Sequence, residues 1–255
     1  MPKFFVVSDI HGFYDIFIDA LDKAGFDKNN EDHYLICCGD YFDRGKQPHE
    51  VMNFLMSLPR KILIRGNHEI LFKELCKRGY PCAHDYCNGT MSTLLELGEA
   101  GKGYTFDESV NIAKAKTKLF YNSMINYFET ENYIFVHSWI PTKPDKRDYG
   151  FTRLFKEDWR EATDEEWNKA MWSNPFQMFS QGLNPTKTIV FGHYHCSTGW
   201  AYTEGVSEFG EDAIFDPFVS TKFIAIDACT VHSKKVNVIV IEDNFLNNES
   251  DVVLD

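Results

Sequence analysis

Five short apolar runs, each followed at once by polar residues, constrain the fold of this chain more than any other feature. Each run is four or five residues long, and together they occupy residues 4–8, 34–38, 61–65, 133–136 and 188–191. Apolar runs of this length are typical of strands that are covered on both faces of a sheet. The sequence therefore predicts buried strands that each end in a polar loop.

Helical patterns lie between these runs. A pattern around Ile16 and Phe17 keeps one face apolar, and Gly25 suits the end of that helix. Similar patterns end before Pro59 and Gly79. The alternation of strands and helices predicts an α/β protein whose reactive residues lie at the carboxyl ends of the strands.

No linker-like segment divides the chain, so we expect a single domain over residues 1–255. Three segments lack a clear period: 76–126, 142–172 and 200–217. We expect them to be loop-and-helix insertions over the strand ends, where substrate selectivity commonly arises, with plain solvent-exposed packing as the alternative. Near the end of the chain, runs at 223–227 and 236–241 predict two more strands, joined as a hairpin around 230–235.

Charge and composition argue against some classes of function. The chain has 26 Lys and Arg against 38 Asp and Glu, a formal net charge of −12. This balance argues against sequence-independent nucleic-acid binding, although bound cations could still attract a phosphorylated substrate. No apolar run approaches the roughly 20 residues that span a bilayer, and no signal peptide precedes Asp9, so we expect no membrane partner. The seven scattered cysteines predict reduced thiols and a cytoplasmic location.

Oxygen and imidazole donors follow all five apolar runs. Because the carboxyl ends of parallel strands share one edge of a sheet, these donors are expected to meet there. Carboxylates and imidazoles without thiolates suit Mn, Fe, Zn or Co. One such residue is more often a structural polar group, but a packed interior rarely keeps this many unpaired imidazoles. The candidate metal ligands are Asp9, His11, Asp40, Asn67, His137, His193 and His195.

The motifs that contain these residues resemble those of the metallophosphoesterase (calcineurin-like phosphoesterase) superfamily. They match in order and spacing over residues 9–195: Asp9-Ile10-His11, Gly39-Asp40-Tyr41-Phe42-Asp43-Arg44-Gly45, Gly66-Asn67-His68-Glu69, His137 and Gly192-His193-Tyr194-His195. The chain looks most like the phosphoprotein phosphatase branch, which includes bacteriophage-type serine/threonine phosphatases and symmetrical diadenosine tetraphosphatases. Residues 171–175 and 223–229 resemble two further segments of that branch.

The resemblance implies a four-layer α/β/β/α sandwich, with two mixed sheets and helices on the outer faces. It also implies two divalent metal ions per chain, Mn in the first place, with Fe, Zn, Co or Ni as alternatives. Asp9, His11, Asp40 and His195 would hold one ion. Asp40, Asn67, His137 and His193 would hold the other. A shared carboxylate such as Asp40 is physically required, because two neighbouring cations repel each other.

Further roles follow from the same resemblance. His68 would be the general acid, oriented by Asp43, and Arg44 would bind phosphate oxygens. We also expect Asn67 and Trp139 to contact substrate. The structural alternatives are a solvent-facing His68, a capping Asp43, an Arg44 in a surface ion pair and a Trp139 that fills the core.

One departure from the branch concerns phosphate binding. Phosphoprotein phosphatases commonly carry a second phosphate-binding arginine before the late histidines, but this chain has no arginine between Met171 and Gly192. Arg65, Arg153 or Arg160 could replace it. This gap, together with His195, points toward a small-molecule or nucleotide substrate as the alternative to a phosphoprotein.

We therefore expect a phosphoesterase that hydrolyses phosphomonoesters, phosphoserine/threonine protein phosphatase-like, by attack of a metal-bridging hydroxide. The alternative enzyme is a nucleotide-directed hydrolase, of the symmetrical diadenosine tetraphosphatase or cyclic phosphodiesterase type. The alternative from another class is a binding scaffold without catalysis. The expected partner in either enzyme is a phosphorylated protein, small molecule or nucleotide.

Other polar groups have simpler interpretations. Cys76, Cys82, His84 and Cys87 could form a zinc site, but their spacing lacks paired Cys-x-x-Cys, so we expect unrelated thiols. The acidic residues 129–131 and 249–255 are expected to be solvated.

Overall fold

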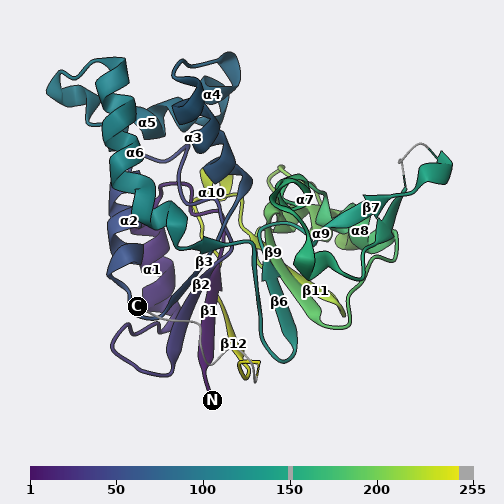
Figure 1. Ribbon diagram of the computed structural model, residues 1–255. Coiled ribbons are helices and arrows are strands. Elements are labelled where there is room, and N and C mark those ends of the chain that lie inside the picture. Colours follow the sequence, from purple (N-terminus) through teal and green to yellow (C-terminus); the bar gives the residue numbers. More distant parts are fainter. Residues whose placement is uncertain (149–151, 247–255) are drawn as a thin grey trace.

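Two mixed sheets face each other at the centre of the structure, and helices cover their outer faces (Figure 1). The computed structural model describes residues 1–148 and 152–246. The first sheet has the order β12-β1-β2-β3-β4, and its strands are β1 (Lys3–Val7), β2 (His33–Cys37), β3 (Lys61–Ile64), β4 (Met124–Ile125) and β12 (Ile239–Glu242). The second has the order β10-β11-β9-β6-β5, and its strands are β5 (Tyr127–Glu129), β6 (Tyr133–Val136), β9 (Thr188–His195), β10 (Phe218–Val219) and β11 (Phe223–Asp227). Both sheets are parallel apart from an antiparallel strand at one or both edges, so the expected fold class is confirmed.

The helices divide between the two outer faces in chain order (Figure 1). Beside the first sheet lie α1 (Tyr14–Ala24), α2 (Pro48–Ser57), α3 (Asn67–Arg78), α4 (Ala83–Asn88), α5 (Thr90–Leu97) and α6 (Phe106–Asn122). Beside the second lie α7 (Asp164–Ala170), α8 (Pro175–Ser180) and α9 (Cys196–Glu204), and α10 (Thr230–Ser233) follows β11. None of the helices in residues 1–148 and 152–246 is long and apolar enough to cross a membrane.

Strand β1 shows why the sheets are buried on both faces. Phe5 and Val7 belong to the core beneath the helices, whereas Phe4 and Val6 belong to the core between the two sheets. Successive strand residues point to opposite faces, so a strand between two cores must be apolar throughout. The continuous apolar runs in the sequence reflect this position.

The ends of the helices follow local sequence chemistry. Gly25 and Gly79 adopt left-handed conformations, with φ of 81° and 76°, directly after α1 and α3. Glycine reaches this region without steric cost, so it ends a helix well. Pro48 begins α2, where its missing N–H loses no helical hydrogen bond. The three predicted helices are therefore confirmed.

The predicted hairpin near the end of the chain is wrong. β11 pairs with β9 and β10 in the second sheet, whereas β12 pairs antiparallel with β1 in the first. The two strands lie in different sheets, with α10 between them. The apolar pattern of each strand reports its burial but not its partner, so it could not distinguish a hairpin from a crossover.

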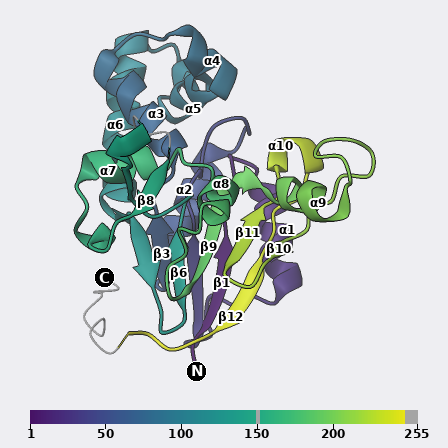
Figure 2. The same cartoon turned by 90° about the vertical axis from the view of Figure 1, so that its right-hand side faces the viewer.

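The three segments without a clear period contain helices and loops, and one of them also contains strands, which the sequence did not predict. Segment 76–126 is mostly helical, and α4 and α5 lie beyond one end of the strands in both views (Figures 1 and 2). Segment 142–172 carries a two-stranded sheet of β7 (Thr142–Pro144) and β8 (Arg153–Phe155), and residues 149–151 lie outside the described residues. Segment 200–217 contains the end of α9 and then a loop.

The structure also bears on two minor predictions, one about the acidic residues and one about the cysteines. Glu129 was expected in solvent but is buried, with Arg160 and Lys187 both donating hydrogen bonds to its carboxylate. Glu129 lies on the face of β5 that also carries Tyr127, opposite Phe128, so the prediction was wrong for this residue. Residues 249–255 lie outside the described residues. Among the described residues, no group of candidate metal ligands includes Cys76, Cys82, His84 or Cys87.

Candidate metal centre

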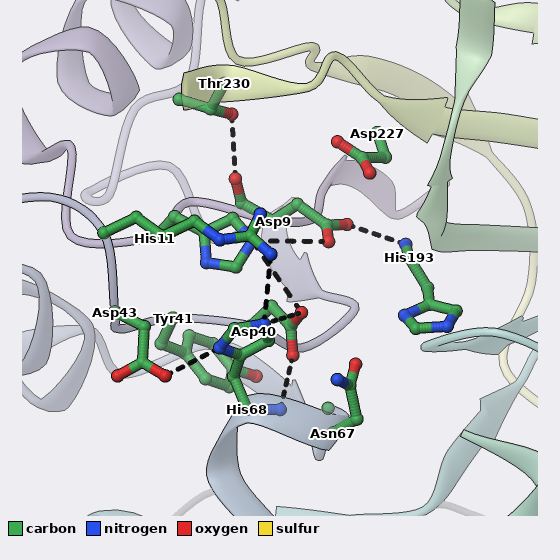
Figure 3. Close-up of polar contacts among 12 residues, drawn as sticks. Asp9, His11, Asp40, Tyr41, Asp43, Asn67, His68, His193, Asp227 and Thr230 are labelled. Atoms are coloured by element: carbon green, nitrogen blue, oxygen red, sulfur yellow. Dashed lines mark hydrogen bonds and ion pairs between the residues drawn. The ribbon is translucent and has the colours of Figure 1, made fainter. Parts of the chain in front are cut away.

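Polar loops from both sheets meet at the carboxyl ends of the strands (Figure 3). Asp9 and His11 follow β1, Asp40 follows β2, and His137 follows β6. The backbone N–H of His193 donates to Asp9 Oδ2 at 3.0 Å, which connects the end of β9 with the loop after β1. The two sheets therefore contribute to one site, as the strand pattern predicted.

The backbone around this site is held in an unusual conformation. Left-handed φ values between 50° and 68° occur at Asp9, His11, Asp40, Asp43, Arg44 and His193. Such values cost about 1–3 kcal/mol per residue outside glycine and persist where the surroundings enforce them. Strain of this kind concentrates at functional sites, because it aims side chains in directions that regular structure does not allow.

Motif glycines allow the loops to approach one another. A Cβ added at Gly66 would overlap Asp40 Oδ1 and the Asp40 backbone nitrogen. In return, Glu69 Oε2 accepts hydrogen bonds from the N–H groups of Gly66 at 2.8 Å and Asp40 at 3.0 Å. Glu69 is fully buried, and it thereby fixes the loop after β2 against the start of α3.

One group of candidate ligands is formed by Asp40, His137 and His193, whose donor atoms all lie within 4.8 Å of one another. His137 Nδ1 lies 2.7 Å from the Cys38 carbonyl oxygen, to which it donates. The other ring nitrogen, His137 Nε2, lies 3.5 Å from Asp40 Oδ1 and 2.7 Å from Asn67 Oδ1. Acceptor atoms that converge in this way suit a cation between them.

A second group shares Asp40 with the first. It contains His11, Asp40 and His68. His11 Nδ1 lies 2.9 Å from the Phe42 carbonyl oxygen, so the Nε2 atom of the neutral ring is directed inward, 3.8 Å from Asp40 Oδ2 and 3.9 Å from Asp9 Oδ1. The two Asp40 oxygens thus face different groups, which is the arrangement expected of a shared carboxylate.

Burial sets the charge states of these donors. Burial, together with the Asp40 carboxylate, raises the pKa of Asp9 to about 6. Burial also lowers the pKa of His193 to about 3 and that of His11 well below 6.5. A neutral imidazole is the form that binds metal, and closely spaced buried carboxylates are stabilised by a cation. The donor chemistry of the site therefore fits divalent cations.

Asp43 and Arg44 lie beside His68, which is itself a member of the second group. His68 Nδ1 lies 2.6 Å from Asp43 Oδ2, and Arg44 Nη2 lies 3.4 Å from His68 Nε2. Burial disfavours the charged imidazolium, but the carboxylates of Asp40 and Asp43 outweigh it and raise the pKa of His68 to about 9. The two carboxylates thus favour the protonated form of His68, and Asp43 occupies one ring nitrogen.

Comparison with known proteins identifies the family. The family model for calcineurin-like phosphoesterases matches residues 2–197. The chain belongs to the calcineurin-like phosphoesterase family. This family consists of phosphoester hydrolases that use divalent metals, and the described residues include two groups of ligands that could hold them.

Individual relatives match over shorter segments. A symmetrical bis(5'-nucleosyl)-tetraphosphatase of Buchnera aphidicola is 39% identical over 67 residues, which are 26% of this chain and 24% of that protein. The asymmetrical bis(5'-nucleosyl)-tetraphosphatase PrpE of Bacillus velezensis is 38% identical over 104 residues, which are 37% of this chain and 40% of that protein. The matches span less than half the length of either relative. Among solved structures, a serine/threonine protein phosphatase from Saccharomyces cerevisiae matches over 97% of this chain and 82% of its own, at 16% identity and a TM-score of 0.47.

Not every expected site residue of this calcineurin-like phosphoesterase lies in a ligand group or on the surface. Trp139 is 1% exposed and packs against Phe191 in the core outside the second sheet, and its expected substrate contact stays a prediction. His195 lies in neither of the two ligand groups of the described residues, and the same is true of Asp9. His195 Nε2 lies 3.7 Å from Asp227 Oδ2 instead, and its role as a ligand stays a prediction.

The candidate replacements for the missing phosphate-binding arginine are all occupied elsewhere. Arg65 binds the Asn126 side chain and pairs with Asp164, Arg153 binds Thr142, and Arg160 binds the buried Glu129. Arg44 is the only arginine of the described residues with a contact to His11 or His68. Among the described residues, one guanidinium therefore contacts the histidines of this site.

Sequence reasoning missed several residues around the site. Asp227 is buried beside His195, and Thr230 donates a hydrogen bond to the Asp9 carbonyl oxygen at 2.8 Å (Figure 3). Trp172 is 49% exposed, and its ring meets that of His193 edge to face at 6.2 Å. The position of Asp227 at the end of the apolar strand β11 was a usable signal, since the other site carboxylates also lie at strand ends. Segments 171–175 and 223–229 resembled the branch, but that resemblance gave neither Trp172 nor Asp227 a role, and no local pattern marked Thr230.

Proposed function

We propose that this chain hydrolyses phosphomonoesters at a site that holds two divalent metal ions, with Mn as the first candidate. The observation that carries this proposal is Asp40, whose two carboxylate oxygens face His137 on one side and His11 on the other. A carboxylate in this position can be shared by two cations. The proposed ligands are Asp9, His11, Asp40 and His195 for one ion and Asp40, Asn67, His137 and His193 for the other.

When bound, two such cations supply positive charge for the phosphate oxygens and a water of lowered pKa for attack on phosphorus. The protein supplies the remaining groups. The Arg44 guanidinium is exposed and can bind two phosphate oxygens at once. Asn67 presents an amide in the same place, where it can contact both a cation and a phosphate oxygen.

His68 is the proposed general acid for the leaving alkoxide. Its Nδ1 is occupied by Asp43 at 2.6 Å, so the proton to be donated is on Nε2, the atom that faces Asp40 and Arg44. Imidazolium is a suitable acid near neutral pH, and a carboxylate partner favours that charged form. An acid at this point matters most when the leaving alkoxide is strongly basic.

A nucleotide-directed hydrolase is the second candidate, and two exposed aromatic rings favour it. Trp172 meets His193 at 6.2 Å, and Phe209, which is 50% exposed, meets His195 edge to face at 5.4 Å. Exposed aromatic rings on two sides of a phosphate-binding centre offer stacking surfaces for nucleobases. The names of the two tetraphosphatase relatives support the same substrate class.

The test is a comparison of substrates under metal control. Protein is stripped with EDTA, Mn²⁺ is restored, and turnover is measured on p-nitrophenyl phosphate, bis(p-nitrophenyl) phosphate and diadenosine tetraphosphate. Highest kcat/KM on the monoester supports the first candidate, and highest kcat/KM on the dinucleotide supports the second. Absence of turnover with Mn²⁺ on all three would favour the binding scaffold.

A matched pair of variants makes the comparison sharper. Asp40→Asn should abolish Mn²⁺-dependent turnover and lower the number of metal ions bound per chain. Asp19→Asn makes the same chemical change at an exposed residue of α1, whose ion pair within the described part of the chain is with Lys23, so it should alter neither quantity. Equal behaviour of the two variants would contradict the assignment of Asp40.

A further inference from the structure

Helix α5, which belongs to the segment without a clear period at 76–126, brings two buried threonines to the carboxylate of Asp43. Thr90 is the first residue of this helix and Thr93 lies one turn later. Both side chains are at most 1% exposed, and Asp43 is 0% exposed. The family motifs contain Asp43 but neither threonine, so this contact comes from a part of the chain outside them.

Each carboxylate oxygen of Asp43 accepts a short hydrogen bond from a threonine hydroxyl. Thr93 Oγ1 donates to Asp43 Oδ1 at 2.7 Å and accepts the Asp43 N–H at 2.9 Å. Thr90 Oγ1 donates to Asp43 Oδ2 at 2.7 Å, the oxygen that also receives His68 Nδ1 at 2.6 Å. Each carboxylate oxygen thus has a hydroxyl donor, and the plane of the carboxylate is fixed relative to the imidazole ring of His68.

A simpler role for the threonines would be to donate their hydroxyl hydrogen bonds to backbone carbonyl oxygens of their own helix. Thr117 on α6 does this, since its hydroxyl donates to the Ala113 carbonyl oxygen at 2.8 Å. The corresponding distance from Thr93 Oγ1 to the Gly89 carbonyl oxygen is 3.4 Å, far longer than its 2.7 Å bond to Asp43. The Thr93 hydroxyl is therefore directed at the carboxylate and away from the helix.

The backbone supports the same contact. Gly89 precedes α5 with a φ of 85°, and a Cβ at this position would overlap the Arg44 backbone nitrogen. The start of α5 thus lies directly against Asp43 and Arg44, which both have left-handed φ values, 68° and 64°. Strained residues keep their conformation only where neighbours enforce it, and α5 is the neighbour here.

We propose that Thr90 and Thr93 are positioning residues for the reaction, acting through Asp43 on the direction in which His68 presents its Nε2 proton. The inference rests on the proposed function of His68 as general acid. Without the two hydroxyls, the Asp43 carboxylate is free to turn about its Cβ–Cγ bond, and the ring that depends on it loses its alignment with the leaving oxygen. Loss of alignment affects only those esters whose leaving group needs a proton.

The test replaces each threonine by valine, which keeps the shape and removes the hydroxyl, in single and double variants. Turnover is measured with glycerol 2-phosphate, a poor leaving group, and with 2,4-dinitrophenyl phosphate, a good one. The double variant should lose about 10- to 100-fold in kcat on the first substrate and less than about 3-fold on the second, because general acids contribute about 10²–10⁴-fold where a proton is needed. Thr90→Ser and Thr93→Ser restore the hydroxyl and should restore kcat.

Three outcomes would overturn the inference: equal losses on both esters, unchanged kcat on glycerol 2-phosphate, or no rescue by serine. Thr117→Val is the matched control, since it removes a buried threonine hydroxyl from α6 and should change neither rate. If the double variant fails to fold, the single variants are tested in its place, and a larger loss on glycerol 2-phosphate than on 2,4-dinitrophenyl phosphate is expected of them as well.

An NMR measurement separates this inference from the proposed function, because it needs no turnover. The His68 Nδ1 proton, hydrogen-bonded to Asp43, should give a slowly exchanging low-field signal in the wild-type and serine proteins and a faster-exchanging one in the valine proteins. Unchanged exchange in the double valine variant would refute positioning by the threonines. If instead the signal responds as expected but His68→Ala leaves the leaving-group dependence unaltered, the general-acid role of His68 is wrong.

Discussion

Asp9 Oδ2 accepts the backbone N–H of His193 at 3.0 Å, although the two residues are 184 positions apart in the chain. The bond connects the loop after β1 in one sheet with the end of β9 in the other. It lies beside Gly192, where an added Cβ would overlap both Asp9 Oδ2 and Ser8 Oγ. The glycine in the Gly192-His193-Tyr194-His195 motif therefore serves the contact between the sheets, while the histidines face the site.

Gly192→Ala tests this contact. The new methyl group must displace the Asp9 carboxylate, so Mn²⁺ affinity should fall about 10- to 100-fold and the free energy of unfolding by about 1–3 kcal/mol. Metal titration and thermal unfolding measure the two effects. Gly101→Ala is the control, because a Cβ there has no atom within 4 Å and should leave both quantities unchanged. Wild-type affinity in Gly192→Ala would show that the loops can separate without loss of the site.

His68→Ala tests the proposed general acid. Since His68 belongs to the proton-donating side of the site, the variant should lose about 10²–10⁴-fold in kcat on glycerol 2-phosphate but far less on p-nitrophenyl phosphate. Metal content, measured by elemental analysis, should stay at the wild-type value. Equal slowing of both esters would mean that the general-acid assignment is wrong. Loss of a metal ion would mean that His68 acts as a ligand, as its place beside His11 and Asp40 would allow.

Glu129 gives a prediction for stability against pH. Burial alone would raise its pKa, but hydrogen bonds from Arg160 and Lys187 hold it below the usual 4.5. A carboxyl with a lowered folded-state pKa stabilises the fold above its unfolded-state pKa, and that contribution is lost as the pH falls through the folded-state value. Glu129→Gln should thus lower the free energy of unfolding by about 1–2 kcal/mol at pH 7, with the difference from wild type shrinking below about pH 4.5.

Urea unfolding at several pH values measures this difference. The matched control is Glu165→Gln, which removes an exposed i,i+4 partner of Lys169 on α7 and should change stability by less than about 0.5 kcal/mol. A difference between Glu129→Gln and wild type that stays constant from pH 7 to pH 3 would contradict the ionised buried carboxylate.

The sequence predicted the strands and the convergence of their loops because both follow from short-range patterns. A strand covered on two faces must be continuously apolar, and a polar residue directly after it must lie at the sheet edge. Asp9, Asp40 and His137 all obeyed this rule. The glycines of the motifs followed a second rule, which is that loops in close contact leave no room for a Cβ. Gly66 is an example.

What the sequence could not predict depends on which segments become neighbours. The apolar run at 236–241 is the same whether it pairs with β11 or with β1, so the hairpin prediction had no local signal to correct it. Trp139 follows a site histidine, yet its side chain points into the core next to Phe191. Thr93 lies in a segment without a clear period, and only the folded chain brings it to Asp43.

Trp172 and Phe209 provide the test of substrate class. Both rings are about half exposed beside candidate metal ligands, although burial of a large aromatic side chain is favourable by about 1.5–3 kcal/mol. If they stack on nucleobases, Trp172→Ala and Phe209→Ala should each raise KM for diadenosine tetraphosphate roughly 5- to 30-fold, the equivalent of about 1–2 kcal/mol of stacking. KM for glycerol 2-phosphate should not change, because that substrate has no ring.

Tyr86→Ala, at a 62% exposed aromatic of α4, is the control for removal of surface area and should alter neither KM. Equal changes in KM for both substrates would mean that the two rings support the structure of the site and do not stack on nucleobases. A phosphomonoester would then remain the better substrate class.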